Sequence, residues 1–249
     1  MLDALLESGK MKHELYCDDS LKKIIEDNSV DMFLLFPPYF SMDYERYGGN
    51  INAQINSKHD YKKFLKNLVT ITQNAESALK EFGNIILVLP ANNISLLPDY
   101  FDAITKKTKL NINPVLIWSH YAPQNRISGP FAFDYCNVVH LSKNIPKYDP
   151  IFRKDNNDSV FVVPLNSLET EPYSHLGYTG DNMPLDTAKW LINNFSLPGD
   201  TVADLFGGTG TTSVAAEILK RNSIYVDCSI EQFNIAQTRI NDAVEVFMN

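Results

Sequence analysis

The 249-residue sequence predicts an α/β protein with a largely parallel sheet that is covered by helices on both faces. Short apolar runs suited to buried strands alternate with segments whose apolar residues recur at helical spacing. A glycine-rich turn joins one of these runs to a helix, as happens at the ligand-binding edge of such sheets. The seven runs that we expect to be strands are 12–17, 30–36, 84–89, 113–118, 137–142, 201–206 and 223–228.

Two helices have clear sequence patterns. Between residues 60 and 82, apolar side chains recur at helical spacing, and Gly83 follows as a candidate for the C-terminal cap. The last helix is expected to begin at Ser229, with Gln232 three residues later as the partner in a capping box. Its predicted buried stripe consists of Ile230, Phe233, Ala236, Ile240, Val244 and Phe247.

The segment Thr201–Asp227 (TVADLFGGTGTTSVAAEILKRNSIYVD) reads as strand, glycine turn, helix, strand and acidic residue. The glycines of the turn lack a Cβ, so the backbone there can turn tightly and approach a ligand closely. They are Gly207, Gly208 and Gly210. Asp227 follows them by about 20 residues, a position from which an acid can accept hydrogen bonds from ribose hydroxyls. The segment therefore predicts a site for a nucleoside-containing cofactor.

The residues after Gly210 narrow the choice of cofactor. A phosphate-binding P-loop needs Lys and then Ser or Thr after its last glycine, whereas Thr211 and Thr212 follow here. Either threonine can begin the next helix. A dinucleotide fingerprint matches only imperfectly, because Ser213 stands where the last glycine is required. A turn that needs glycines for its shape alone remains an alternative.

A second feature lies at the end of the apolar run Val30–Tyr39 (VDMFLLFPPY). Pro37 and Pro38 fix φ and end the strand, which makes a rigid lip at its carboxyl end. Tyr39 follows as an aromatic platform. Taken alone, this pattern favours a proline turn beside a core tyrosine.

Together these features resemble the DNA amino-methyltransferases, which methylate adenine N6 or cytosine N4. The signature of that family is an acid, Ser or Asn before Pro-Pro-Tyr, together with a phenylalanine-glycine loop that ends in Gly-Thr-Thr. Here the loop reads Asp204–Thr212 (DLFGGTGTT). Leu15–Leu21 (LYCDDSL) looks like the family's motif around Gly-Asp-Ser, and Met183–Phe195 looks like the helix that closes the pocket for S-adenosyl-L-methionine (AdoMet). The order of these motifs is that of the permuted β group.

The resemblance covers nearly the whole chain and implies a Rossmann-like AdoMet-dependent methyltransferase fold, with a seven-stranded, mostly parallel sheet and a permuted motif order. It implies that Asp19 receives the adenine amine of AdoMet and that Asp227 receives the ribose. The full set of implied cofactor residues is Asp19, Pro184, Asp204, Phe206, Gly207, Gly208, Gly210, Thr211, Thr212 and Asp227.

The resemblance also implies a target site for a base that is flipped out of double-stranded DNA. Its residues are Phe36, Pro37, Pro38 and Tyr39. The ring of Tyr39 would stack on the base, and the carbonyl of Pro37 would accept a hydrogen bond from the exocyclic amine. The polar residue of the family would accept a second one, which turns the lone pair of the amine toward the methyl group.

Phe36 departs from this pattern, because a phenylalanine cannot accept that hydrogen bond. Losing a positioned proton acceptor costs roughly 10²–10⁴-fold in rate. Three explanations stay open. Ser41 or Asp43 supplies the acceptor; the chain is a degenerate AdoMet- or nucleic-acid-binding subunit of a methyltransferase complex; or the target is RNA or a small molecule.

The net charge of −8 is unfavourable for a DNA-binding chain, because Lys and Arg contacts to phosphate supply much of the affinity. A local basic groove remains compatible with an acidic total. Its candidates are Lys106, Lys107, Lys109, Lys143, Lys147, Arg153 and Lys154, although each cluster is more typical of an ordinary solvated face.

The three cysteines are widely spaced, which favours reduced thiols over a zinc site, and we expect no metal. They are Cys17, Cys136 and Cys228. No signal peptide or membrane-spanning run is predicted, so the chain is expected to be cytoplasmic.

We expect one methyltransferase domain over residues 1–249, in the restriction-modification or host-marking role that the family implies. Residues 143–180 fit a small target-recognition insertion or a plain connector, and the polar loop Phe40–His59 fits a lid over the site. A homodimer and a heteromeric methyltransferase partner both stay open.

Overall fold

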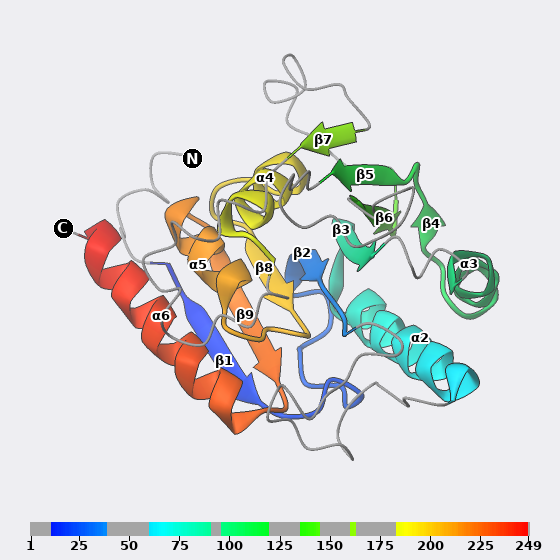
Figure 1. The fold of residues 1–249 in the computed structure, drawn as a ribbon, viewed down its shortest axis with the longest axis horizontal. Coiled ribbons are helices and arrows are strands. Elements are labelled where there is room, and N and C mark those ends of the chain that lie inside the picture. Colours follow the sequence, from blue (N-terminus) through cyan, green and yellow to red (C-terminus); the bar gives the residue numbers. More distant parts are fainter. Residues whose placement is uncertain are drawn as a thin grey trace, which may run out of the picture.

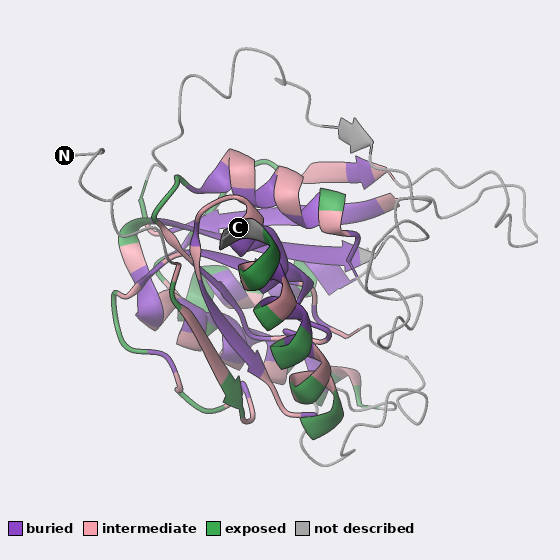
Figure 2. Cartoon of the chain, turned by 90° about the vertical axis from the view of Figure 1, so that its left-hand side faces the viewer, coloured by how far each residue is buried: buried purple, intermediate pink, exposed green. Residues whose placement is uncertain are grey.

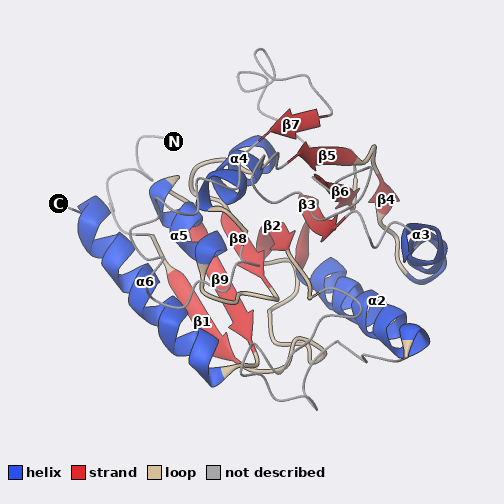
Figure 3. Cartoon of the chain, in the orientation of Figure 1, coloured by secondary structure: helices blue, strands red, loops and turns tan. Residues whose placement is uncertain are grey.

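The computed structural model describes residues 11–38, 60–90, 96–119, 135–144, 160–162 and 183–248. These residues form a nine-stranded sheet with helices on both faces, which confirms the predicted α/β class (Figure 1, Figure 3). The strands are β1 (His13–Cys17), β2 (Val30–Leu35), β3 (Leu79–Pro90), β4 (Asn111–Ile112), β5 (Leu116–Ser119), β6 (Tyr135–Ser142), β7 (Val160–Val162), β8 (Thr201–Asp204) and β9 (Asn222–Asp227). The helices are α2 (Tyr61–Ala78), α3 (Leu96–Lys107), α4 (Leu185–Phe195), α5 (Thr211–Ile218) and α6 (Ile230–Met248).

The strand order is β1-β9-β8-β2-β3-β6-β5-β7, and β4 pairs with β6 beside this path. Every described pairing is parallel except those of β6 with β3, β4 and β5. The mostly parallel sheet is therefore confirmed, and each of the seven predicted runs contains a strand. The predicted number of strands was wrong, because β4 has only two residues, one of them polar, and the apolar run of β7 (VFV) is only three residues long.

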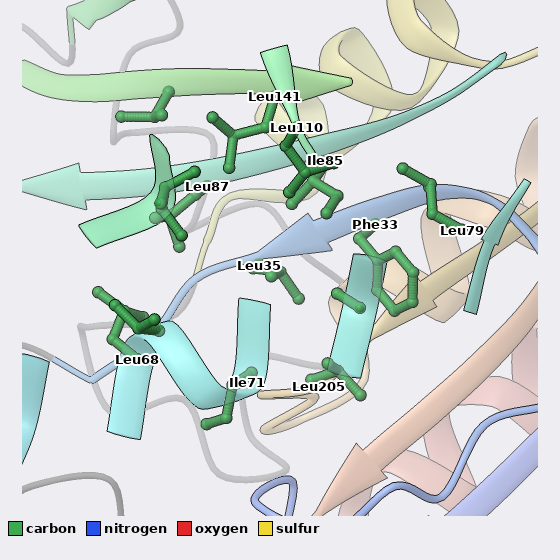
Figure 4. Close-up of a cluster of buried hydrophobic side chains, with 14 of the residues drawn as sticks. Phe33, Leu35, Leu68, Ile71, Leu79, Ile85, Leu87, Leu110, Leu141 and Leu205 are labelled. Carbon is green, nitrogen blue, oxygen red and sulfur yellow. The ribbon is translucent and has the colours of Figure 1, made fainter. Parts of the chain in front are cut away.

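The sheet is buried on both faces, as its continuous apolar strands require (Figure 2). Phe33 and Leu35 of β2 belong to the cluster beneath α2 and α3, which Figure 4 shows in part. Met32 and Leu34, which point to the opposite face, belong to the cluster beneath α4 and α5. All four side chains are at most 1% exposed. Burying one such side chain contributes about 1.5–3 kcal/mol, so β2 is anchored from both sides next to β8.

The end of α2 differs from the prediction. The helix ends at Ala78, and the chain enters β3 at Leu79 with an extended backbone (φ −70°, ψ 133°). Gly83 therefore lies inside a strand and is not a helix cap. A Cβ at this position would lie 2.8 Å from the carbonyl oxygen of Asp31, so the glycine permits the close approach of β2. The apolar spacing continued past the helix because Leu79 is itself a fully buried core residue.

The start of α6 confirms Ser229 as the N-cap, since its Oγ accepts a hydrogen bond from the amide of Gln232 at 3.3 Å. The amide of Ser229 donates instead to Oδ1 of Asp227 at 2.8 Å, so an acid at the sheet edge fixes where this helix begins. Ile230 is 60% exposed, and its place in the predicted buried stripe was wrong. It lies in the first turn, which starts at the edge of the sheet.

No helix in the described ranges is long and apolar enough to cross a bilayer.

Candidate active site

The predicted site residues of four separate segments meet along one edge of the sheet (Figure 1). Phe33 of β2 pairs with Ala203 of β8, so the chain leaves these two strands side by side. Cys17 of β1 pairs in register with Asp227 of β9 in the same parallel sheet. The segments that follow β1, β2, β8 and β9 therefore share the carboxyl edge, where ligands bind in α/β proteins.

The loop after β8 needs its glycines for different reasons. Gly208 and Gly210 have positive φ angles of 50° and 84°, which other residues rarely adopt. Gly207 is required by close packing, because a Cβ there would lie 2.2 Å from the ring of Tyr225. The hydroxyl of Tyr225 donates to the carbonyl of Gly208 at 2.8 Å. The loop is thus a tight, glycine-rich turn that leads into α5, with Gly210 as the N-cap.

Asp204 braces this loop from within. It is 5% exposed, and its Oδ1 accepts from the amide of Phe206 at 2.9 Å while its Oδ2 accepts from the Thr212 hydroxyl at 2.6 Å. Burial raises the pKa of this carboxyl to about 7, although both hydrogen bonds act to lower it. Asp204 and Thr212 are therefore engaged with each other, and they set the shape of the turn.

Asp227 lies at the end of β9 and is partly exposed. Its Oδ2 accepts a hydrogen bond from the amide of Gly208 at 2.9 Å, and its Oδ1 accepts from the amide of Ser229. Burial raises the pKa of the carboxyl above its ordinary value, against these bonds. A carboxylate offers about four lone-pair positions, so Asp227 retains acceptor capacity for a ligand hydroxyl.

Asp19 lies in the turn after β1, where its Oδ1 accepts from the amide of Leu21 at 2.9 Å. The neighbouring Ser20 donates its hydroxyl to the carbonyl of Leu205 at 2.5 Å. This bond ties the Asp19 turn directly to the glycine loop across 185 residues of sequence. Sequence reasoning missed the role of Ser20, because the bond exists only once β1 and β8 share an edge.

The Pro-Pro segment leaves β2 beside this loop. Phe36 is partly buried and packs against the apolar cluster beneath α4, and Pro37 is buried. Tyr39 lies outside the described residues, as do the alternative acceptors Ser41 and Asp43. The structure thus places an apolar ring where the family has its polar acceptor.

The predicted helix at 183–195 is confirmed as α4, and Pro184 occupies its N-cap position (φ −58°, ψ 141°). The carbonyl of Pro184 accepts the first helical hydrogen bond, from the amide of Ala188 at 3.0 Å. Met183 is 6% exposed in the same cluster as Phe36. The helix start and the Pro-Pro segment therefore contact one apolar layer.

The described basic candidates lie elsewhere. Lys106, Lys107, Lys109 and Lys143 line a broad depression of about 610 Å³ together with Asn28 and Ser77, which precede β2 and β3. This is the amino edge of the sheet, opposite the glycine loop. Lys106 pairs with Asp102 at 2.7 Å, and acids line the same depression. These lysines do not form a basic groove at the site; Lys147, Arg153 and Lys154 lie outside the described residues.

The part of the chain that the structure describes holds no group of three or more His, Cys, Asp or Glu side chains placed to bind a metal ion.

Comparison with known proteins assigns this architecture to a family. A sequence model of the DNA methylase family matches residues 30–238, so the chain belongs to that family. This assignment confirms the resemblance to the DNA amino-methyltransferases.

Several relatives align over nearly the whole chain. It is 26% identical over 242 residues to the type II methyltransferase M2.MboI of Moraxella bovis, covering 90% of this chain and 85% of the relative. It is 23% identical over 257 residues to the type II methyltransferase M.HpaI of Haemophilus parainfluenzae, covering 95% and 77%.

Solved structures share the fold. The cytosine-N4-specific PvuII DNA methyltransferase superposes with a TM-score of 0.71 at 15% identity, covering 96% of this chain and 93% of that one. A complex of M1.HpyAVI with S-adenosylmethionine superposes with a TM-score of 0.64 at 18% identity, covering 92% and 99%.

Proposed function

We propose that this DNA methylase transfers the methyl group of AdoMet to an exocyclic amine, adenine N6 or cytosine N4, of a base flipped out of double-stranded DNA. The observation that carries the proposal is the pairing of β2 with β8, which brings the Pro-Pro segment next to the glycine loop. The carboxyl end of β2 then binds the target base, and the carboxyl end of β8 binds the cofactor. The type II methyltransferases among the relatives support a role in restriction-modification.

The residues along the edge fit AdoMet, because three glycines lie in the loop after β8 and an acid with spare acceptor capacity lies beside it. In this proposal Asp227 accepts from the ribose hydroxyls and Asp19 receives the adenine amine. Phe206 and Pro184 border the pocket. The backbone at Gly207, Gly208 and Gly210 approaches the ligand, while Asp204, Thr211 and Thr212 hold the shape of the loop. AdoMet supplies an electrophilic methyl group on its sulfonium.

The chain's part in the chemistry is to position the amine. The lone pair of an exocyclic amine is delocalised into the base, so it must be turned toward the methyl group before it can attack. The carbonyl of Pro37 accepts a hydrogen bond from the amine, and Tyr39 stacks on the flipped base. Bound AdoMet would supply the methyl group, with a C–N bond formed as its C–S bond breaks, and the proton that the amine loses would pass to solvent water. In-line positioning of this kind supplies much of the rate.

Phe36 favours a second candidate, a catalytically degenerate subunit that binds AdoMet or nucleic acid for an active partner. The specific observation is that its ring packs into the apolar layer beneath α4 and brings no acceptor to the site. We place the catalytic function first because all the predicted cofactor residues lie within the described ranges and flank one edge of the sheet. The two candidates differ in whether any methyl group reaches DNA.

AdoMet binding at the glycine loop is the premise of the proposal, and it can be tested directly. The double variant Gly207→Val plus Gly210→Val would place side chains against Tyr225 and Ala236, at 2.2 Å and 2.9 Å for the Cβ atoms alone. We expect calorimetry to show AdoMet binding to the wild type and none to a folded double variant. Equal binding by both proteins would refute the cofactor assignment, and with it the proposed reaction.

A further inference from the structure

Arg239 is buried beneath the glycine loop. It lies on α6 and is 4% exposed, beside the apolar cluster that includes Ala236 and Ile240 of the same helix. A buried guanidinium is costly unless protein acceptors satisfy its donors, so its place in the core needs a reason.

The contacts of Arg239 give that reason. Its Nη1 donates to the carbonyl oxygen of Thr209 at 2.8 Å, to Oγ1 of Thr209 at 2.7 Å and to Oγ1 of Thr211 at 3.1 Å. These two threonines flank Gly210 at the start of α5. One side chain of α6 therefore spans the tightest part of the loop and holds both of its ends.

The same face of α6 also supports Gly210. A Cβ on Gly210 would lie 2.9 Å from Cβ of Ala236 and 3.5 Å from Cδ1 of Ile240. Ala236, Arg239 and Ile240 are spaced i, i+3 and i+4, which places them on one side of the helix. The helix thus presents a platform of two apolar side chains and one cation to three consecutive loop residues.

Helix electrostatics does not explain this position. Arg239 contacts the amino end of α5, where the helix dipole disfavours a positive charge. Gly210, the N-cap of α5, has no side chain, so Arg239 does not take part in a side-chain capping hydrogen bond there. The interaction is therefore directed at the loop's carbonyl and hydroxyl groups.

We propose that Arg239 is a positioning residue for the methyl donor, which holds Thr209, Gly210 and Thr211 in the conformation that receives AdoMet. This inference rests on the proposed function of the site. Asp227 and Tyr225 hold Gly208 from the β9 side of the loop, and Arg239 holds Thr209 and Thr211 from the α6 side. Without Arg239 the loop keeps its supports from β9 and loses the one from α6.

The test compares Arg239 with Arg221, a second buried arginine that is 2% exposed. Arg221 donates to the carbonyl oxygens of Ser196 and Leu219, at 2.8 Å and 2.6 Å, and it precedes β9, at the opposite end of that strand from Asp227. Arg239→Met, Arg239→Lys and Arg221→Met would each be measured for thermal unfolding, for AdoMet affinity by calorimetry below all transitions, and for kcat and KM.

We expect Arg239→Met to raise the AdoMet Kd at least about tenfold and the KM for AdoMet similarly, with a smaller change in kcat at saturation. Arg239→Lys keeps the charge and part of the bonding, so its affinity should lie between those of Arg239→Met and the wild type. Arg221→Met should lower the thermal transition yet leave the AdoMet Kd unchanged.

Two results would overturn the inference. The first is an unchanged AdoMet Kd in folded Arg239→Met; if that variant does not fold, an unchanged Kd in Arg239→Lys decides equally. The second is an equal loss of AdoMet affinity in Arg221→Met. That result would show that Arg239 affects binding only by stabilising the fold as a whole. A wild-type protein that does not bind AdoMet would refute the proposed function itself, a result distinct from both.

Discussion

Phe36 is the residue that bears most directly on catalysis. In the proposed function it occupies the position at the end of β2 from which an acceptor would turn the target amine, and its ring packs into the layer beneath α4. The carbonyl of Pro37 remains as an acceptor on the same segment. We therefore expect the protein to position its target with one hydrogen bond fewer than its relatives with an acid, Ser or Asn there.

Restoring an oxygen at this position should raise activity. We expect Phe36→Asp to increase the turnover of methyl transfer to DNA by roughly 10²–10⁴-fold, since a positioned acceptor contributes that much. Phe36→Leu is the matched control, because it keeps an apolar side chain and offers no acceptor. Rates would be measured at saturating AdoMet with labelled methyl groups. Equal rates for the Asp and Leu variants would show that another group already supplies the acceptor.

Asp204 gives a prediction about pH. Burial raises its pKa to about 7 in the folded protein, so the folded state binds this proton more tightly than the unfolded chain does. The sign follows from linkage: ionising Asp204 costs stability, which declines as the pH rises from about 4 to about 7. Asp204→Asn removes this titration, and its amide can still bond Phe206 and Thr212. Thermal unfolding should therefore depend less on pH in the variant across this range. An unchanged pH dependence would contradict the raised pKa of Asp204.

At the scale of the element, the loop between β8 and α5 determines whether the cofactor edge exists. Tyr225 and Asp227 of β9 hold it on one side, and α6 holds it on the other. Ser20 connects it to the turn after β1. Because its supports come from three elements, we expect the loop to hold its conformation before a ligand binds, which would lower the entropic cost of binding.

Substitutions at two glycines test separately the effect of close packing, at Gly207, and the effect of backbone strain, at Gly199. Gly207→Ala should abolish AdoMet binding, because its Cβ would overlap the Tyr225 ring. Gly199 has a φ of 88° but nothing within 4 Å of an added Cβ. Gly199→Ala should therefore cost only about 1–2 kcal/mol of unfolding free energy and leave AdoMet affinity unchanged. Calorimetry and urea unfolding of both variants check this, and full affinity in Gly207→Ala would contradict the packing argument.

The sequence predicted those elements whose signal is local. Apolar runs marked the buried strands, and the glycines marked the loop. Signals that depend on the assembled fold were missed or misassigned. Gly83 looked like a helix cap because its role depends on the backbone of Asp31 in the neighbouring strand. Arg239 was not among the predicted site residues, because its contact with Thr209, 30 residues away in the sequence, exists only in the assembled fold.

At the scale of the whole molecule, the described lysines of the predicted groove and the candidate active site lie on opposite edges of the sheet. The net charge is −8, and the described lysines of the predicted groove gather at the amino edge of the sheet, away from the glycine loop. DNA that presents a base to the carboxyl edge would not reach them. In the proposed function we therefore expect the phosphate contacts to come from other parts of the chain or from a second subunit.

This separation predicts that three lysines are dispensable for DNA binding. In the combined variant Lys106→Gln, Lys107→Gln and Lys109→Gln, DNA retention should keep its wild-type dependence on salt. Each phosphate contact contributes about −0.9 to the slope of log affinity against log salt. Retention on immobilised duplex DNA over a salt series measures this slope. A slope shallower by about two to three would place these lysines on the DNA and contradict the assigned orientation.

The most direct test of the account is the transfer of a labelled methyl group from AdoMet to unmethylated genomic DNA, with total RNA assayed in parallel. The proposed function predicts label in DNA, recovered after digestion as N6-methyladenine or N4-methylcytosine, and none in RNA. Label in RNA alone would contradict the proposed substrate. No label in either, from protein that binds AdoMet by calorimetry, would contradict catalysis and identify the chain as a cofactor-binding subunit.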